Sequence, residues 1–149
     1  MVNYKKFIAL IVILFTCIIG SAHAEQRPDV ADNVIAYKGQ QGVIVWTLRI
    51  GDRNANEALV QIEGIDHDWN LKIQKMQVEK TSRDTRYSIN INGNKFVALI
   101  IENKCCGNLY IPEESQPISV NYSEGISHEG NAQAFLTDYL QAKNNEINK

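Results

Sequence analysis

Apolar residues recur with a period of two over most of the chain, and short runs of this kind are separated by turn residues. The run at 43–50 places Ile44, Trp46, Leu48 and Ile50 on one face. Short runs with this spacing are typical of an all-β domain. The pattern predicts strands near 43–50, 58–65, 71–81, 87–91, 96–101, 109–111 and 118–122.

The strongest local signal is an Asn-Gly pair at 92–93, because these residues accept the two positive φ values of a type I′ hairpin turn. With the turn at this place, Ile89 lies opposite Phe96 and Tyr87 lies opposite Ala98. The apolar side chains of both strands then share one face of the ladder. The pair therefore predicts a hairpin and its register.

Residues 96–101 are apolar on both faces, which predicts a central strand that is covered twice. The period changes after Gly130, where five apolar residues form the stripe of an amphipathic helix and Asn131 is its N-cap. We expect this helix to cover the second face of the central strand. The predicted fold is mainly β: an antiparallel sheet, sandwich or partial barrel of about seven to eight strands with one C-terminal amphipathic helix. The stripe consists of Ala132, Phe135, Leu136, Tyr139 and Leu140.

The first 24 residues have the pattern of a cleaved secretory signal peptide. Lys5 and Lys6 precede an apolar run over 7–20, and Ala22 and Ala24 supply the small residues of a cleavage site. The run is shorter than the roughly 20 residues with which a helix crosses a bilayer, and no later segment is apolar enough to cross. The pattern predicts an exported protein without a transmembrane anchor in the mature chain. The expected compartment is the bacterial periplasm, with secretion into the medium as the alternative.

Removal of residues 1–24 leaves enough chain for one domain with a single packed core. The removed segment holds two Lys and no acidic residue, so the net charge moves from −2 to −4. A mild acidic excess argues against nucleic-acid binding, which depends on Lys and Arg that neutralise phosphates. The predicted organisation is the signal peptide at 1–24, a flexible leader at 25–33, a β-rich domain with its C-terminal helix at 34–145 and a loose tail at 146–149.

Cys105 and Cys106 are adjacent, in a predicted turn after the central strand, whereas Cys17 falls in the signal peptide. Adjacent Cα atoms are about 3.8 Å apart across a trans peptide, below the roughly 4.4 to 6.8 Å of most disulfides. Thiols rarely stay free in an oxidising compartment. A strained vicinal disulfide, a disulfide to another chain and protected buried thiols are the three alternatives. Redox or metal chemistry is a further possibility for the pair.

The segment 66–70 gathers two carboxylates, an imidazole and an indole between two predicted strands. Its spacing begins like that of a calcium loop, but Leu71 and Gln77 occupy the positions that require Gly and Glu. A polar turn with the indole on the core is one interpretation, and an exposed Trp that anchors a partner is the other. The candidate partner-binding residues are Asp66, His67, Asp68 and Trp69.

His67 and His128 are weak candidates for metal binding. Zinc sites show several ligands at fixed short spacings, and the mature chain has only two His and two Cys in no such pattern. The sequence also lacks a nucleophile motif and a phosphate-binding loop, so no catalytic residue and no cofactor is predicted.

The sequence favours a small, exported, non-enzymatic binding module that acts on another exported or envelope protein, as an inhibitor, immunity protein or assembly factor does. Loops at the ends of strands are frequent positions for binding residues. The alternative hypothesis is a periplasmic protein of thiol redox or metal handling that uses Cys105 and Cys106. Neither the partner nor the oligomeric state follows from the sequence.

Overall fold

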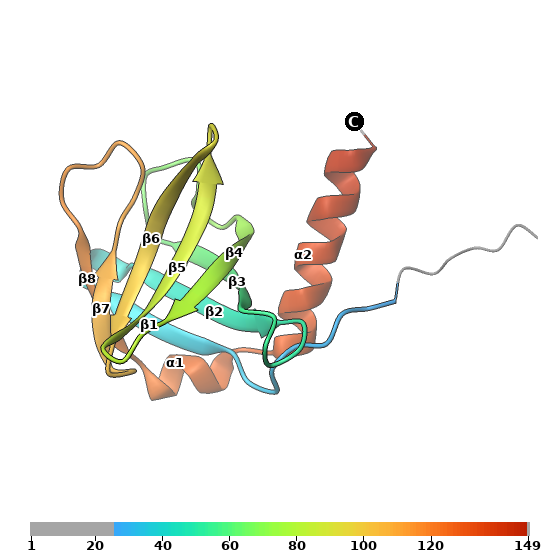
Figure 1. The fold of residues 1–149 in the computed structure, drawn as a ribbon, viewed down its shortest axis with the longest axis horizontal. Helices are drawn as coiled ribbons and strands as arrows, with labels where there is room; N and C mark the ends of the chain where they lie inside the picture. The colour runs from blue at the N-terminus through green and yellow to red at the C-terminus, as the bar shows by residue number, and fades with distance from the viewer. Residues whose placement is uncertain (1–25, 149) are drawn as a thin grey trace, which may run out of the picture.

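The computed structural model describes residues 26–148, so the predicted signal peptide lies outside the described residues. The described chain forms a closed antiparallel barrel of eight strands and two helices, which confirms the mainly β fold with a C-terminal helix (Figure 1). The elements are β1 (Ile35–Gly39), η2 (Gln40–Gly42), β2 (Ile44–Ile50), β3 (Glu57–Glu63), β4 (Ile73–Lys80), β5 (Asp84–Ile91), β6 (Asn94–Glu102), β7 (Cys106–Leu109), β8 (Ile118–Tyr122), α1 (Glu124–Glu129) and α2 (Ala132–Ile147).

Each strand pairs with the next along the chain, and β8 returns to pair with β1. In this last pair Tyr37 lies opposite Tyr122 and Gly39 lies opposite Val120. We call the β1–β8 pair the seam of the barrel. The seam satisfies the two strand edges that an open sheet of the same order would leave unpaired.

The Asn-Gly hairpin forms as predicted, with φ of 50° at Asn92 and 81° at Gly93, and with Ile89 opposite Phe96. The prediction for Tyr87 is wrong, because its partner is Leu99. The register shifts between Tyr87 and Ser88, which accommodates one extra residue in β6.

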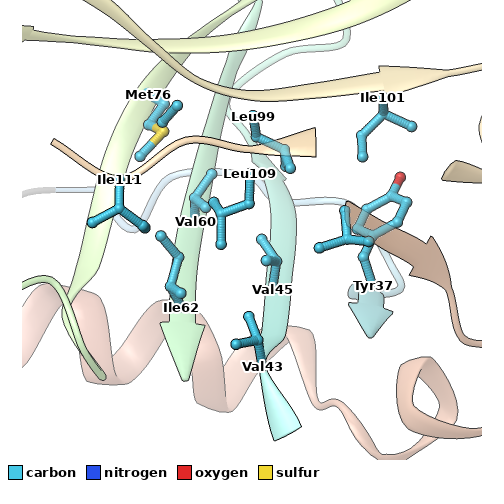
Figure 2. Packing of buried hydrophobic residues seen from close by; sticks show 12 residues of the cluster. Tyr37, Val43, Val45, Val60, Ile62, Met76, Leu99, Ile101, Leu109 and Ile111 are labelled. Carbon is cyan, nitrogen blue, oxygen red and sulfur yellow. The ribbon is translucent and has the colours of Figure 1, made fainter. Parts of the chain in front are cut away.

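The main core fills the interior of the barrel, and its buried residues come from every strand except β5, whose Tyr87 and Ile89 pack against it. Figure 2 shows buried side chains of this cluster converging. Val45, Val60 and Leu99 are at most 1 % exposed. Half-buried aromatic residues, among them Trp69 and Phe96, pack against this cluster.

Helix α2 covers the outside of the barrel. Its Leu136 is fully buried in a second cluster with Leu48 of β2 and Leu59 of β3. All five residues of the predicted stripe belong to this cluster. The expected position over the central strand 96–101 is wrong, since the cluster is built from β2, β3 and their neighbours and contains no residue of β6.

The short helix α1 continues the seam and was not predicted. The Ser123 hydroxyl caps α1 by accepting from the Ile126 N–H (3.4 Å), and its backbone N–H donates to Ala36 O (2.9 Å). The Ala36 N–H donates to the Ser127 hydroxyl (2.8 Å). Ser123 and helix α1 thereby provide hydrogen-bond partners for the backbone of Ala36, which lies just beyond the Tyr37–Tyr122 pair where the β1–β8 ladder ends.

The segment before β1 is bonded to the barrel. The Gly51 N–H donates to Asp29 O (2.7 Å), the Ala31 N–H donates to Arg49 O (3.0 Å), and Arg27 donates to the side chain and carbonyl of Gln133 on α2.

Within residues 26–148, neither helix combines the length and the apolar character needed to pass through a membrane.

Candidate functional site

A cavity of about 500 Å³ opens at one end of the barrel. Its lining residues lie where β2, β4, β6 and β8 finish and where β1, β3 and β5 begin, so they come from the same end of the antiparallel barrel. We call this the open end and the opposite one the closed end. The volume lies within the range of about 300 to 1,000 Å³ that is usual for small-molecule sites.

The cavity exists because small and short side chains lie on the inner face toward the open end. Ala58 of β3 is the smallest of them and precedes Val60 and Ile62 of the core, so it lies nearer the open end than these two residues. Thr47 and Val78 continue the wall on the neighbouring strands. An eight-stranded barrel is just wide enough either to be filled by side chains or to hold one small ligand. Here the closed half is filled and the open half is hollow.

Phenol rings form part of the wall of this cavity. Tyr37 and Tyr122 face each other across the seam, with ring centroids 6.3 Å apart, and Tyr87 lines the opposite wall. Burial raises the pKa of Tyr37 well above its ordinary value, and nearby Tyr87, Tyr122 and Cys105 raise it further. Burial also raises the pKa of Tyr87, and a hydrogen bond with Thr47 opposes this effect. Both phenols are therefore neutral donors at physiological pH.

Four cationic side chains line the cavity: Arg49, Arg53, Lys80 and Lys104. Arg49 is half-buried on β2, and its guanidinium donates to Gly51 O. The other three are exposed and belong to the end of β4 and to two connections between strands. Positive charge thus surrounds the entrance of a cavity whose deeper wall is apolar and phenolic.

The positive charge at the entrance is not neutralised locally. Of the described residues that line the cavity, Glu57 alone is acidic, and its carboxylate lies 3.1 Å from Lys75 Nζ. Across residues 26–148, none of the four lining cations forms an ion pair. A low-dielectric wall next to unpaired cations favours an anionic group on a bound molecule.

Two apolar side chains are exposed at the rim of the cavity. Ile35 is 43 % exposed and Tyr122 is 46 % exposed, and both line the cavity. A ligand that entered the open end would cover apolar surface on these residues and gain free energy from its removal from water.

The predicted partner-binding loop lies at the closed end, away from the cavity. Asp66 and Asp68 are exposed, and His67 Nδ1 accepts from the Trp69 N–H (3.0 Å). Trp69 is half-buried and packs edge to face on Phe96, with ring centroids 5.8 Å apart. The indole therefore faces the core of the barrel, and only part of it is free to contact a partner.

The structure places the other sequence candidates at different points. Cys105 and Cys106 lie at the open end with free thiols, whereas His67 lies at the closed end. His128 is exposed on α1, with Nε2 3.7 Å from Glu124 Oε1. In the described part of the chain, no three His, Cys, Asp or Glu side chains form a group that could hold a metal ion. His67 does not share a site with the cysteines.

The cavity was not predicted, since its residues come from seven strands and adjoining turns. One sequence signal pointed to it: Val45, Thr47 and Arg49 follow one another on the same face of a strand, and a cation on a face otherwise suited to burial is unusual. No protein-family model matches the chain, and no curated protein or solved structure shows significant similarity to it.

Proposed function

We propose that this protein is a non-enzymatic binding module that takes a small amphiphilic anion into the open end of its barrel. The observation that carries the proposal is the cavity of about 500 Å³, with apolar and phenolic walls and four cations free of ion pairs at its entrance. The apolar part of the ligand would contact Ala58, Val78 and Ile101, and its anionic group would lie near Arg49 and Lys80. The signal-peptide pattern supports the periplasm as the compartment.

The test is a binding competition among amphiphiles that differ only in charge. Anilinonaphthalene sulfonate serves as the fluorescent probe, and decanoate, decanol and decyltrimethylammonium serve as competitors. Decanoate is expected to displace the probe at a concentration at least about tenfold lower than decanol, since a charge-assisted hydrogen bond contributes about 1.5 to 3 kcal/mol. The cationic competitor is expected to be the weakest. Equal displacement by all three would refute recognition by the cations.

Charge variants locate the site. Arg49→Gln and Lys80→Gln are each expected to weaken decanoate binding by about tenfold and to leave decanol binding unchanged. Lys72→Gln is the matched control, because Lys72 is exposed in the β3–β4 connection at the closed end. Ala58→Trp places a large ring in the cavity and is expected to abolish binding of every competitor. Full probe binding by the Trp variant would place the ligand elsewhere.

A second proposed function is docking of an exported or envelope protein at the closed end. Its support is Leu71, which is 59 % exposed beside the 66–70 loop and has a left-handed φ of 63°. Leu71→Asn suits this conformation and removes the apolar contact. The variant is expected to lose a partner that the wild type captures from a periplasmic extract, whereas Ile147→Asn, at an exposed apolar residue of α2, keeps it. Equal capture by wild type and Leu71→Asn would exclude docking at this residue.

A further inference from the structure

The two adjacent cysteines lie at the rim of the cavity. Lys104, which directly precedes them, lines the cavity, and Tyr122, which lines it from β8, is bonded to the same turn. Cys105 is exposed and Cys106 is half-buried. The two thiols belong to adjacent residues, and the Cys105 thiol donates to Glu102 O (3.5 Å). Two thiols that are close together and open to solvent can react with an external disulfide.

The backbone of Cys105 holds the rim together. Its N–H donates to Glu102 O (3.1 Å), and its carbonyl accepts from the Tyr122 N–H (2.6 Å). Asn103 and Lys104 have left-handed φ values of 46° and 62°, which non-glycine residues adopt at a cost. The conformation of this turn therefore depends on the hydrogen bonds of Cys105, and this conformation determines the position of Lys104.

A disulfide between adjacent residues does not fit the present turn. Adjacent Cα atoms are about 3.8 Å apart across a trans peptide, whereas disulfides usually require about 4.4 to 6.8 Å. Bridging must rotate the peptide between Cys105 and Cys106, and this peptide includes the carbonyl that holds Tyr122. Bridging would thus displace Lys104 and loosen Tyr122 at the entrance.

We propose that Cys105 and Cys106 form a dithiol–disulfide modification site, and that the bridged form binds the anionic ligand of the cavity more weakly than the dithiol form. In the first step Cys105 thiolate attacks an external disulfide, forms a mixed disulfide and releases one thiol. In the second step Cys106 thiolate attacks the Cys105 sulfur, closes the vicinal bridge and releases the second thiol. The dithiol loses two electrons, and the external disulfide gains them.

The order of the two steps follows from exposure and acidity. Cys105 is the more exposed thiol. Donation of a hydrogen bond from the Cys106 thiol to Cys105 raises the pKa of Cys106, because it stabilises the protonated form, and burial raises this pKa further, so Cys106 is a poor source of thiolate before the first step. Cys106 gains its thiolate more readily once Cys105 is consumed in the mixed disulfide, because this hydrogen bond is then lost.

The bridge itself is tested by mass spectrometry, independently of any ligand. The protein is treated with oxidised glutathione, alkylated and digested with trypsin, which places both cysteines on one peptide, 105–143. The expected peptide has lost two hydrogens and carries no alkyl group. Cys106→Ser is expected to stop at a glutathione adduct on Cys105. A persistent glutathione adduct on the wild type, or a dimer through either cysteine, would overturn the vicinal bridge.

The effect on binding rests on the proposed function and is measured with the anilinonaphthalene sulfonate probe. The bridged form is expected to bind it about tenfold more weakly than the reduced form, through loss of one charge-assisted contact. Dithiothreitol is expected to restore the affinity. Lys104→Gln is expected to reduce the difference between the two forms, because the bridge acts through Lys104. Equal affinity of both forms would overturn the coupling, whereas a reduced form that does not bind the probe would refute the ligand site and leave the mass result standing.

Discussion

The contact between α2 and the barrel leads to a quantitative prediction for Leu136→Ala. Leu136 is fully buried between Leu48 and Leu59, which are themselves at most 1 % exposed. Leu→Ala substitutions in cores cost about 2 to 5 kcal/mol, and a helix that can move slightly toward the barrel recovers part of the loss. We therefore expect a loss of about 3 kcal/mol in the free energy of unfolding. At about 4 °C per kcal/mol for a domain of this size, Tm should fall by about 12 °C.

The assay is urea and thermal unfolding, followed by circular dichroism and by tryptophan fluorescence. Trp46 packs against the same cluster and donates from Nε1 to Glu63 Oε1 (2.8 Å), so its fluorescence reports on this contact. Asp138→Ala, at an exposed position of α2, is the control and should change stability by less than about 0.5 kcal/mol. A loss below about 1 kcal/mol for Leu136→Ala would refute the buried contact. Separate transitions for the two probes would show that α2 detaches before the barrel unfolds.

Two further predictions concern backbone approach and ionisation. Gly107→Ala should prevent folding or lower the free energy of unfolding by at least about 3 kcal/mol, because its Cβ would lie 1.9 Å from Ile100 O. Gly125→Ala is the control and should be tolerated, because no atom lies within 4 Å of its Cβ. Urea unfolding of both variants tests the prediction. In the wild type the raised pKa of Tyr37 means that this phenol ionises in the unfolded state at a lower pH than in the folded state, so the stability of the wild type falls as pH rises above about 10. Tyr37→Phe removes this phenol and should therefore lose less stability than the wild type in the same pH range. Parallel stability curves for wild type and Tyr37→Phe from neutral to alkaline pH would contradict the burial of that phenol.

The strand periodicity of the chain predicted the fold class. It did not predict which face of each strand points to the inside of the barrel. In β2 the more apolar face, with Trp46, Leu48 and Ile50, points outward and is covered by α2. The inner face carries Thr47 and Arg49, which line the cavity. Periodicity identifies two faces of a strand, and a barrel with a helix on its outside buries both. Which face is inside depends on pairing with distant strands.

The turns were more predictable than the site, because a turn depends on adjacent residues. The Asn-Gly pair at 92–93 determines its own hairpin, and Asn131 caps α2 by accepting from the Ala134 N–H (2.9 Å). The irregularity at Tyr87 and Ser88 has no local signature, and it shifted the predicted partner of Tyr87 by one residue. The cavity depends on the same long-range pairing, since its wall combines residues from seven strands.

The seam of the barrel has a consequence for when the cavity forms during folding. Tyr37 and Tyr122 belong to the first and last strands, so the seam joins the two most distant parts of the sheet in the sequence. Contacts between distant residues carry a large loop-closure entropy and generally form slowly. Both tyrosines also line the cavity. The wall of the cavity is therefore completed only when the barrel closes, and a growing chain that lacks β8 has not yet formed it.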